Sequence, residues 1–144
     1  MSDNYTRIEF LSKSSNESFA RVAAAAFASQ LDPTVEEIAD IKTAVSEAVT
    51  NAIVHGYRGT RGNVVMECRL TGNTVEISVE DFGCGIDDVE KAKEPLFTTH
   101  SDEERSGMGF TVMEMFMDSM DVTSKIGEGT KVIMTKKINA GAAE

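Results

Sequence analysis

The sequence predicts a two-layer α/β sandwich, in which a mixed, largely antiparallel sheet carries its helices on one face. The expected order of elements is a strand, two helices, two strands, a long loop, a helix and two strands. Long amphipathic helices need a sheet to cover, and strands joined by tight turns pair antiparallel. The chain has 144 residues, so we expect residues 1–144 to form a single domain with its own core.

The N-terminal elements are predicted from alternation, helical spacing and capping signals. Residues 5–11 alternate in side-chain character, which indicates a half-buried strand. Ser14 and Glu17 have the spacing of a capping box and predict the start of a helix. The apolar face expected for this helix follows helical intervals: Phe19, Val22, Ala23, Ala26, Phe27 and Leu31.

A second helix is predicted behind another capping box, formed by Thr34 and Glu37. Residues 64–70 and 74–80 have the pattern of two strands joined by a Gly-Asn hairpin turn. The apolar face of the second helix is expected to contain Ile38, Ile41, Val45, Ala48, Val49 and Ala52.

The C-terminal half begins with a long, mostly irregular stretch over residues 81–106, with one helical turn near 87–93. Long loops of this kind often bind ligands. A helix is expected over residues 109–120 and strands over 122–125 and 131–137. The helix carries an apolar stripe that is expected to pack in the core: Phe110, Met113, Met117 and Met120.

Composition narrows the class of protein. The net charge of −10, from 14 Lys and Arg against 24 Asp and Glu, argues against binding to a nucleic-acid backbone. This charge is consistent with binding to a partner that has a basic surface, and it is equally consistent with a role in solubility alone. No apolar run approaches the roughly 18–20 residues of a membrane span, and no signal-peptide pattern follows Met1. Cys68 and Cys84 are expected to be reduced thiols, so we expect a cytoplasmic protein without membrane association.

Glu47, Asn51 and His55 recur every four residues in the second predicted helix. Four residues advance the side-chain direction by only about 40°, so the three form one polar stripe. A solvated helix face is the ordinary reason for such a stripe. Here the neighbouring residues are apolar, and a half-buried carboxylate needs a partner, a proton or a metal. We therefore expect a functional role for Glu47 and Asn51, and leave the role of His55 open.

Asp81 ends a predicted strand and is followed by Gly83 and Gly85. Asp and Gly are ordinary turn residues, which is one explanation of this motif. Glycines behind an acid at a strand end also permit a ligand to approach the backbone closely. In that case the Asp81 carboxylate can accept a hydrogen bond from an exocyclic amine.

Gly107-Met108-Gly109 is expected to open a helix and to present backbone amides to phosphates. The motif is weak alone, and neither a Walker loop nor a Rossmann fingerprint is present. Arg105 lies two residues before it, where a guanidinium can act in catalysis by pairing with a terminal phosphate. With oxygen ligands and the Asp81 acceptor, these pieces supply what a Mg-nucleotide site requires.

This combination resembles the GHKL ATPase superfamily, which has the Bergerat fold of gyrase, MutL and histidine kinases. The matching motifs are Glu47-x-x-x-Asn51, Asp81-x-Gly83-x-Gly85, Gly107-x-Gly109 and Gly127-x-Gly129-Thr130. Longer segments are similar to the anti-sigma F factors of endospore-forming bacteria. These segments are residues 16–21, 46–53, 55–57, 95–99, 104–110 and 113–118.

The resemblance implies a role for individual residues. Glu47 would be the general base, Asn51 the Mg²⁺ ligand and Asp81 the acceptor of the adenine amine. Arg21, on the first helix, matches a residue that contacts protein partners. The implied ATP-binding residues are Asn51, Asp81, Gly83, Gly85, Thr98, Thr99, Ser106, Gly107, Met108, Gly109, Phe110 and Thr130, with Thr98 and Thr99 in a lid and Thr130 supporting the adenine pocket.

The implied function is that of an ATP- and Mg²⁺-dependent protein-serine kinase. Such a kinase would also bind and inhibit a sporulation sigma factor of the sigma F type, and would phosphorylate a serine of its anti-anti-sigma antagonist. The family also implies a homodimer.

Three alternatives stay open: a stress-response anti-sigma kinase, a nucleotide-dependent binding module without catalysis, and a free-standing ATPase. Glu47 distinguishes an enzyme from a pure binding module, because only the enzyme needs a base. His100-Ser101 follows Thr99 where relatives are expected to have Lys-Pro, which leaves lid behaviour and partner affinity open.

Overall fold

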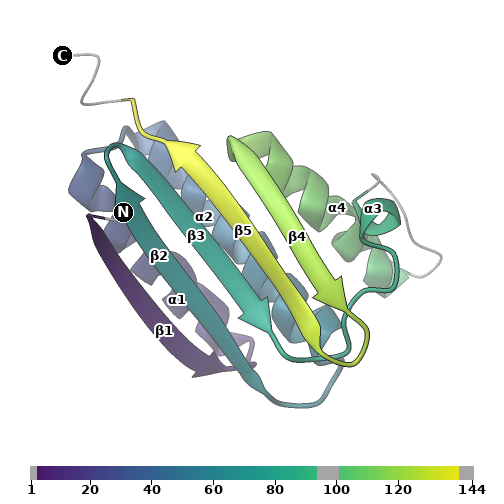
Figure 1. The fold of residues 1–144 in the computed structure, drawn as a ribbon. Helices are drawn as coiled ribbons and strands as arrows, with labels where there is room; N and C mark the ends of the chain where they lie inside the picture. The colour runs from purple at the N-terminus through teal and green to yellow at the C-terminus, as the bar shows by residue number, and fades with distance from the viewer. Residues whose placement is uncertain (1–2, 94–100, 140–144) are drawn as a thin grey trace.

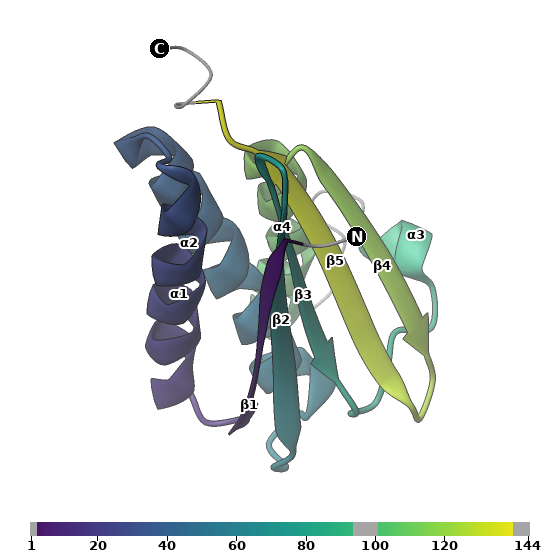
Figure 2. The same cartoon turned by 60° about the vertical axis from the view of Figure 1, so that its left-hand side comes forward.

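A computed structural model describes residues 3–93 and 101–139. They form a five-stranded sheet with α1, α2 and α4 packed behind it, so the two-layer sandwich is confirmed (Figures 1 and 2). The strands are β1 (Asn4–Leu11), β2 (Asn63–Thr71), β3 (Thr74–Asp81), β4 (Ser119–Lys125) and β5 (Gly129–Lys137). The helices are α1 (Ser15–Ala28), the 3₁₀ turn η1 (Ser29–Leu31), α2 (Val35–Thr50), the π-helix η2 (Asn51–Gly56), α3 (Val89–Ala92) and α4 (Ser101–Phe116).

The strand order is β1-β2-β3-β5-β4, and each pairing between described strands is antiparallel. The expectation of a mixed sheet is therefore wrong. The β2–β3 hairpin turns at the predicted Gly-Asn pair, where Gly72 has φ 60° and Thr71 faces Thr74. Because β5 lies between β3 and β4, the segment after β3 passes through α3, α4 and the edge strand β4 before it returns to the middle of the sheet.

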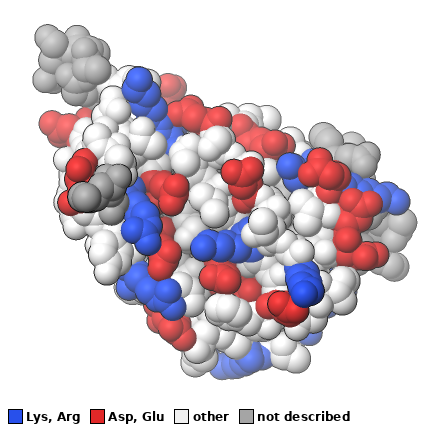
Figure 3. All heavy atoms as spheres, in the orientation of Figure 1, with Lys and Arg blue, Asp and Glu red and all other residues white. Residues whose placement is uncertain are grey.

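The core lies between the sheet and the helices. Alternate residues of β2 and β3, among them Val64, Met66 and Ile77, are fully buried under α1, α2 and α4. The opposite face of the sheet is covered by intermixed acidic and basic side chains (Figure 3). Arg7 and Glu67 pair there across β1 and β2 at 3.1 Å. One face of the sheet is thus apolar and covered, and the other is polar and exposed.

The predicted buried face of α1 is partly confirmed, because Ala23, Phe27 and Leu31 pack against the core. The rest of the predicted face is wrong. Phe19 and Val22 are 54% and 58% exposed, whereas Ala20, Ala24 and Ala28 are buried. Small alanine side chains let α1 pack closely against its neighbours, and Phe19 and Val22 are turned outward. The Ser14 capping box is also wrong, because the Ser14 side chain makes no capping hydrogen bond. Glu17 instead accepts a hydrogen bond of 2.6 Å from Ser46 on α2.

The start of α2 is confirmed, and its end differs from expectation. Thr34 Oγ1 accepts from the Glu37 backbone N–H at 3.0 Å, and the Glu37 carboxylate accepts from the Thr34 backbone N–H at 2.9 Å, which completes the capping box. After Thr50 the helix continues directly as η2, where Tyr57 N–H donates to Ala52 O over five residues. A single π-helical turn of this kind is frequent at functional sites.

The boundaries of α4 and β4 differ most from the sequence-based expectation. The helix starts eight residues before Gly109 and ends at Phe116, so residues 101–106 are helical instead of irregular. The predicted turn near residues 87–93 is confirmed as α3. Met120 lies on β4, which begins at Ser119, although Met120 still packs against the core. In the described part of the chain, the helices are too short or too polar to cross a membrane.

Candidate nucleotide site

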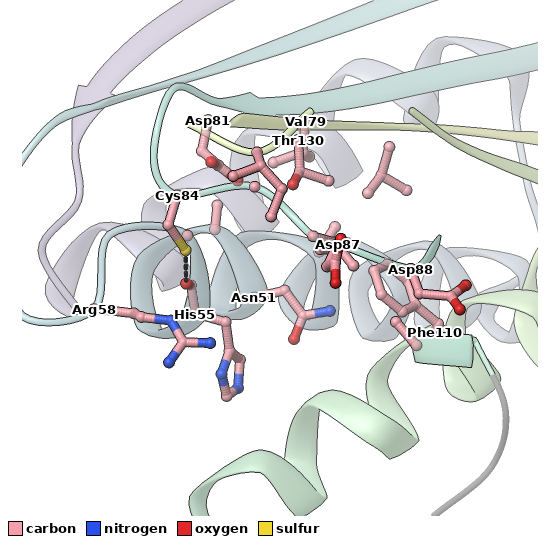
Figure 4. A pocket seen from close by; sticks show the side chains of 18 of the residues that line it. Asn51, His55, Arg58, Val79, Asp81, Cys84, Asp87, Asp88, Phe110 and Thr130 are labelled. Carbon is pink, nitrogen blue, oxygen red and sulfur yellow. Dashed lines mark hydrogen bonds between the residues drawn. The ribbon is translucent and has the colours of Figure 1, made fainter. Parts of the chain in front are cut away.

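A pocket of about 680 Å³ opens between η2, the end of β3 and the β4–β5 hairpin. Its volume is in the range of small-molecule sites. Figure 4 shows Asn51 and His55 on one side, Asp81, Val79 and Thr130 on the other, and Asp87, Asp88 and Phe110 at one end. The pocket thus gathers residues from four separate parts of the sequence.

Asp81 is the buried acid of this pocket, with only 5% of its surface exposed. It faces Thr130 across the β3–β5 pairing, and one carboxylate oxygen accepts a 3.0 Å bond from Gly83 N–H. Burial raises the pKa of Asp81, and backbone hydrogen bonds from Gly83 and Thr130 oppose that rise. A buried carboxylate beside an apolar wall can accept a hydrogen bond from an amine of a flat heterocycle.

Gly83 and Gly85 serve the packing of the protein backbone. A β-carbon on Gly83 would collide with the carbonyl of Gly56, and one on Gly85 would collide with the carbonyl of Lys125. At these two positions it is therefore the protein backbone, and not a ligand, that closely approaches the glycine. Gly85 also lines the pocket, with φ 77°.

Asn51 lies at the first position of η2 and lines the pocket. Among the described residues, no hydrogen-bond partner reaches its buried Nδ2 atom. A buried amide without a partner is unfavourable, so it indicates a position where a ligand completes the hydrogen bonding. Rotating the amide by 180° presents its oxygen to the same space.

The donor set fits a magnesium ion only when a nucleotide is present. No group of three or more His, Cys, Asp or Glu residues that could hold a metal occurs in the described ranges. Magnesium is commonly held by one or two protein oxygens together with substrate phosphates and water. The amide of Asn51 is a suitable single protein ligand in such a shell.

Glu47 does not line this pocket. It is half-buried on α2 and lines a shallow groove beside α1, together with Arg21, Lys42, Thr43 and Ser46. Asn51, one helical turn later, lines the pocket. The polar stripe predicted from spacing therefore divides into two neighbouring hollows, with His55 on the pocket side.

The Gly107–Gly109 segment lies inside α4, so the prediction that it opens a helix is wrong. The preceding Asp, Glu and Arg residues are compatible with a helix, and acidic side chains favour a first turn. Phe110 is buried and lines the pocket. Thr98 and Thr99 lie outside the described residues, as do the side chains of Arg105, Ser106 and Met108.

Comparison with known proteins identifies the domain. Residues 12–136 match the family described as a histidine kinase-like ATPase domain. The chain is 59% identical over 140 residues to the anti-sigma F factor of Clostridium beijerinckii, covering 96% of this chain and 98% of that protein. It is 60% identical over 137 residues to the anti-sigma F factor of a Thermoanaerobacter species, covering 95% and 96%.

The chain belongs to the anti-sigma F factor family.

The fold of this anti-sigma F family member also occurs in more distant solved structures. One contains the RsbU and RsbW domains of Rv1364c from Mycobacterium tuberculosis, with a TM-score of 0.67, 20% identity and coverage of 94% of this chain and 32% of that chain. Another is the blue-light activated histidine kinase EL346 of Erythrobacter litoralis, with a TM-score of 0.57, 21% identity and coverage of 85% and 42%. At this identity the likeness concerns the fold alone. The ATPase domain assigns nucleotide binding to the chain.

Two residues that position Asp81 and the turn after it were assigned no role from the sequence. Tyr57 is 8% exposed, donates to Asn63 O and accepts from Phe82 N–H at 2.9 Å, so it holds the turn that follows Asp81. Gly56 leaves room for Asp81, because a β-carbon there would lie 2.7 Å from the Asp81 carboxylate. The signals available were their place directly after the polar stripe and the similarity of residues 55–57 to anti-sigma F factors.

Proposed function

We propose that this chain is an ATP- and Mg²⁺-dependent protein-serine kinase and a cytoplasmic anti-sigma factor. In this proposal it binds and inhibits a sporulation sigma factor of the sigma F type. It phosphorylates a serine of the anti-anti-sigma antagonist of that factor. The observation that carries the proposal is the division of the polar stripe, with Asn51 in a nucleotide-sized pocket and Glu47 in the adjoining groove.

The nucleotide part of the proposal assigns the adenine to the Asp81 end of the pocket. The Asp81 carboxylate would accept a hydrogen bond from the exocyclic amine, with Gly85 and Thr130 in the surrounding wall. Gly83 would support the site through its N–H, which donates to the Asp81 carboxylate. Asn51 would ligate Mg²⁺, which neutralises charge on the phosphates when bound. Thr98, Thr99 and residues 106–110 are proposed phosphate and lid contacts. Because residues 107–109 lie within α4, their amides become available only if about two turns of that helix unwind.

The catalytic part assigns proton transfer to Glu47. A serine hydroxyl is a weak nucleophile at neutral pH, and a positioned carboxylate can take its proton as the hydroxyl attacks the terminal phosphorus. Glu47 borders a groove open to solvent, where a serine of another protein can approach. Arg105 is proposed to stabilise charge on the transferred phosphoryl group.

The partner part assigns protein contacts to the α1 side of this groove. Arg21 lines the groove, and its Nε lies 3.6 Å from Glu17 Oε2. The same carboxylate oxygen accepts a hydrogen bond from the Ser46 hydroxyl. A basic partner surface would be drawn by the net charge of −10. We include a homodimer in the proposal, on the basis of the family alone.

A paired assay of Glu47→Gln and Asn51→Ala tests the proposal. Glu47→Gln should bind ATP and retain the sigma factor in a pull-down, while phosphorylation of the antagonist falls by about 100- to 10,000-fold. Asn51→Ala should lose Mg-nucleotide binding and any sigma binding that depends on nucleotide. Glu36→Gln, an exposed position at the start of α2, is the matched control and should behave as the native protein.

Two outcomes would contradict the proposal. If Glu47→Gln keeps near-native kinase activity, the base lies elsewhere, and His55 is the next residue to replace. If the native protein retains a sigma factor in a nucleotide-dependent way but never phosphorylates an antagonist, it is a binding module. Capture of a stress-response sigma factor in place of a sigma F type would favour the alternative anti-sigma kinase.

A further inference from the structure

Arg58 has an unusual backbone and a position at the nucleotide pocket. It is the second residue after η2, with φ 44°, and is one of only two non-glycine residues with positive φ in the described ranges. A long side chain rarely adopts this conformation, which is unfavourable without compensating contacts. The conformation places Arg58 along the wall of the pocket, although the residue itself is exposed.

The close view shows where its side chain points. In Figure 4 the Arg58 guanidinium, the His55 ring and the Asn51 amide all lie on the side opposite Asp81. Among the described residues, the Arg58 cation at the pocket wall has no ion-pair partner.

The lining of the pocket has more acidic than basic residues, so a cation at its wall matters for binding an anion. Of the described residues that line the pocket, three are acidic, Asp81, Asp87 and Asp88, and two are basic, Arg58 and Lys91. The whole chain is also acidic, with a net charge of −10. A nucleotide polyphosphate entering this pocket meets repulsion that one magnesium ion only partly offsets. A guanidinium at the wall can form paired hydrogen bonds with phosphate oxygens.

We propose that Arg58 is a phosphate-binding residue of the nucleotide site, contacting the part of the phosphate chain that ADP and ATP share. This inference rests on the proposed ATP site and adds a residue that the sequence motifs do not include. Arg58 provides binding and discrimination between nucleosides and nucleotides. It takes no part in proton transfer, which stays with Glu47.

Calorimetric titration of adenosine, ADP and ATP into the full chain tests this role. Arg58→Asn removes the cation, and asparagine tolerates a positive φ, so the backbone is preserved. It should weaken ADP and ATP binding about tenfold each and leave adenosine binding unchanged. Arg58→Lys should stay within about threefold of the native affinity, since a point charge also binds phosphate. Arg61→Asn, exposed in the same loop and outside the pocket lining, should bind as the native protein does.

The outcomes separate this inference from the proposed function. Failure of the native protein to bind ADP or ATP would overturn the nucleotide site itself. Native-like ADP and ATP affinity in Arg58→Asn would overturn the role of Arg58 while leaving the site intact. Equal loss of adenosine affinity, or equal losses in Arg58→Lys and Arg58→Asn, would show a change of shape in place of a charge contact. If Arg58→Asn does not fold, Arg58→Gly removes the cation and relieves the positive φ.

Discussion

Asn51 on η2 lies directly against Gly109 on α4: a β-carbon at Gly109 would be 3.0 Å from Asn51 Nδ2. The proposed metal ligand and the proposed phosphate segment therefore touch in this structure. A Mg-nucleotide placed at Asn51 would have to separate the two. We therefore expect nucleotide binding to depend on the position and the helicity of α4.

Gly109→Ala should oppose that separation. Alanine in a helix interior is favoured over glycine by about 1 kcal/mol, so the ligand-free protein should become more stable by up to about that amount. The new methyl group also crowds the Asn51 amide, so Mg-ATP affinity should fall. Urea unfolding and calorimetry measure the two effects. Glu114→Ala, exposed on the same helix, is the control and should leave ATP affinity unchanged. Native ATP affinity in Gly109→Ala would show that α4 need not move.

Asp81→Asn should weaken ATP binding and reduce selectivity against GTP. A carboxylate is the stronger acceptor for the adenine amine, and hydrogen bonds to charged groups contribute about 1.5–3 kcal/mol. An amide can in addition donate to the carbonyl of guanine, which a carboxylate cannot do. Competition binding of ATP and GTP to the native and variant proteins measures both changes. Equal affinities of the native protein for the two nucleotides would exclude Asp81 as the adenine acceptor.

The pKa of Asp81 predicts opposite pH dependences for binding and stability. Burial raises this pKa, so acidification protonates Asp81 at a higher pH than an exposed aspartate, and ATP affinity should fall there. The pH dependence of folding stability has the opposite sign. The stability associated with protonated Asp81 is present below its unfolded-state pKa and is lost as the pH rises through the raised folded pKa. ATP titrations and urea unfolding over a pH series, with Asp81→Asn as the pH-insensitive reference, check both signs. A native affinity that follows the Asp81→Asn curve would contradict this assignment.

Tyr57→Phe should destabilise the protein and loosen the turn after Asp81. The substitution leaves the Phe82 N–H and the Asn63 carbonyl without their Tyr57 partner. Both bonds are only partly buried, and a typical hydrogen bond contributes about 0.5–1.5 kcal/mol to stability. A loss of about 1–3 kcal/mol for the two bonds is therefore expected in urea unfolding, with weaker ATP binding. Tyr5→Phe is the matched control, because Tyr5 is exposed and should change stability by less than about 0.5 kcal/mol. Equal effects of the two substitutions would exclude a positioning role for Tyr57.

Much of the fold and part of the site could be predicted from local sequence. The Thr34 capping box and the Gly-Asn hairpin depend on residues only a few positions apart, and both were predicted correctly. Asp81 and Thr130 were also expected to share a site, because each belongs to a motif of the family that the sequence resembles. The structure brings them opposite each other in neighbouring strands.

The rest depended on tertiary contacts. Spacing alone assigned Phe19 and Val22 to the core, but close packing of α1 turned its alanines inward. The start of α4, the π-helical end of α2 and the division between Glu47 and Asn51 are likewise not local properties.

The sequence by itself determined the order of the elements, the antiparallel hairpins and the residue types of a nucleotide site, because periodicity, caps and turns are short-range effects. Only the tertiary structure decided which hollow each polar residue faces. That outcome depends on how helices and strands distant in sequence pack together, as where Gly109 meets Asn51 and Gly83 meets Gly56. Close-packed interiors make such contacts sensitive to single atoms, which local patterns do not encode.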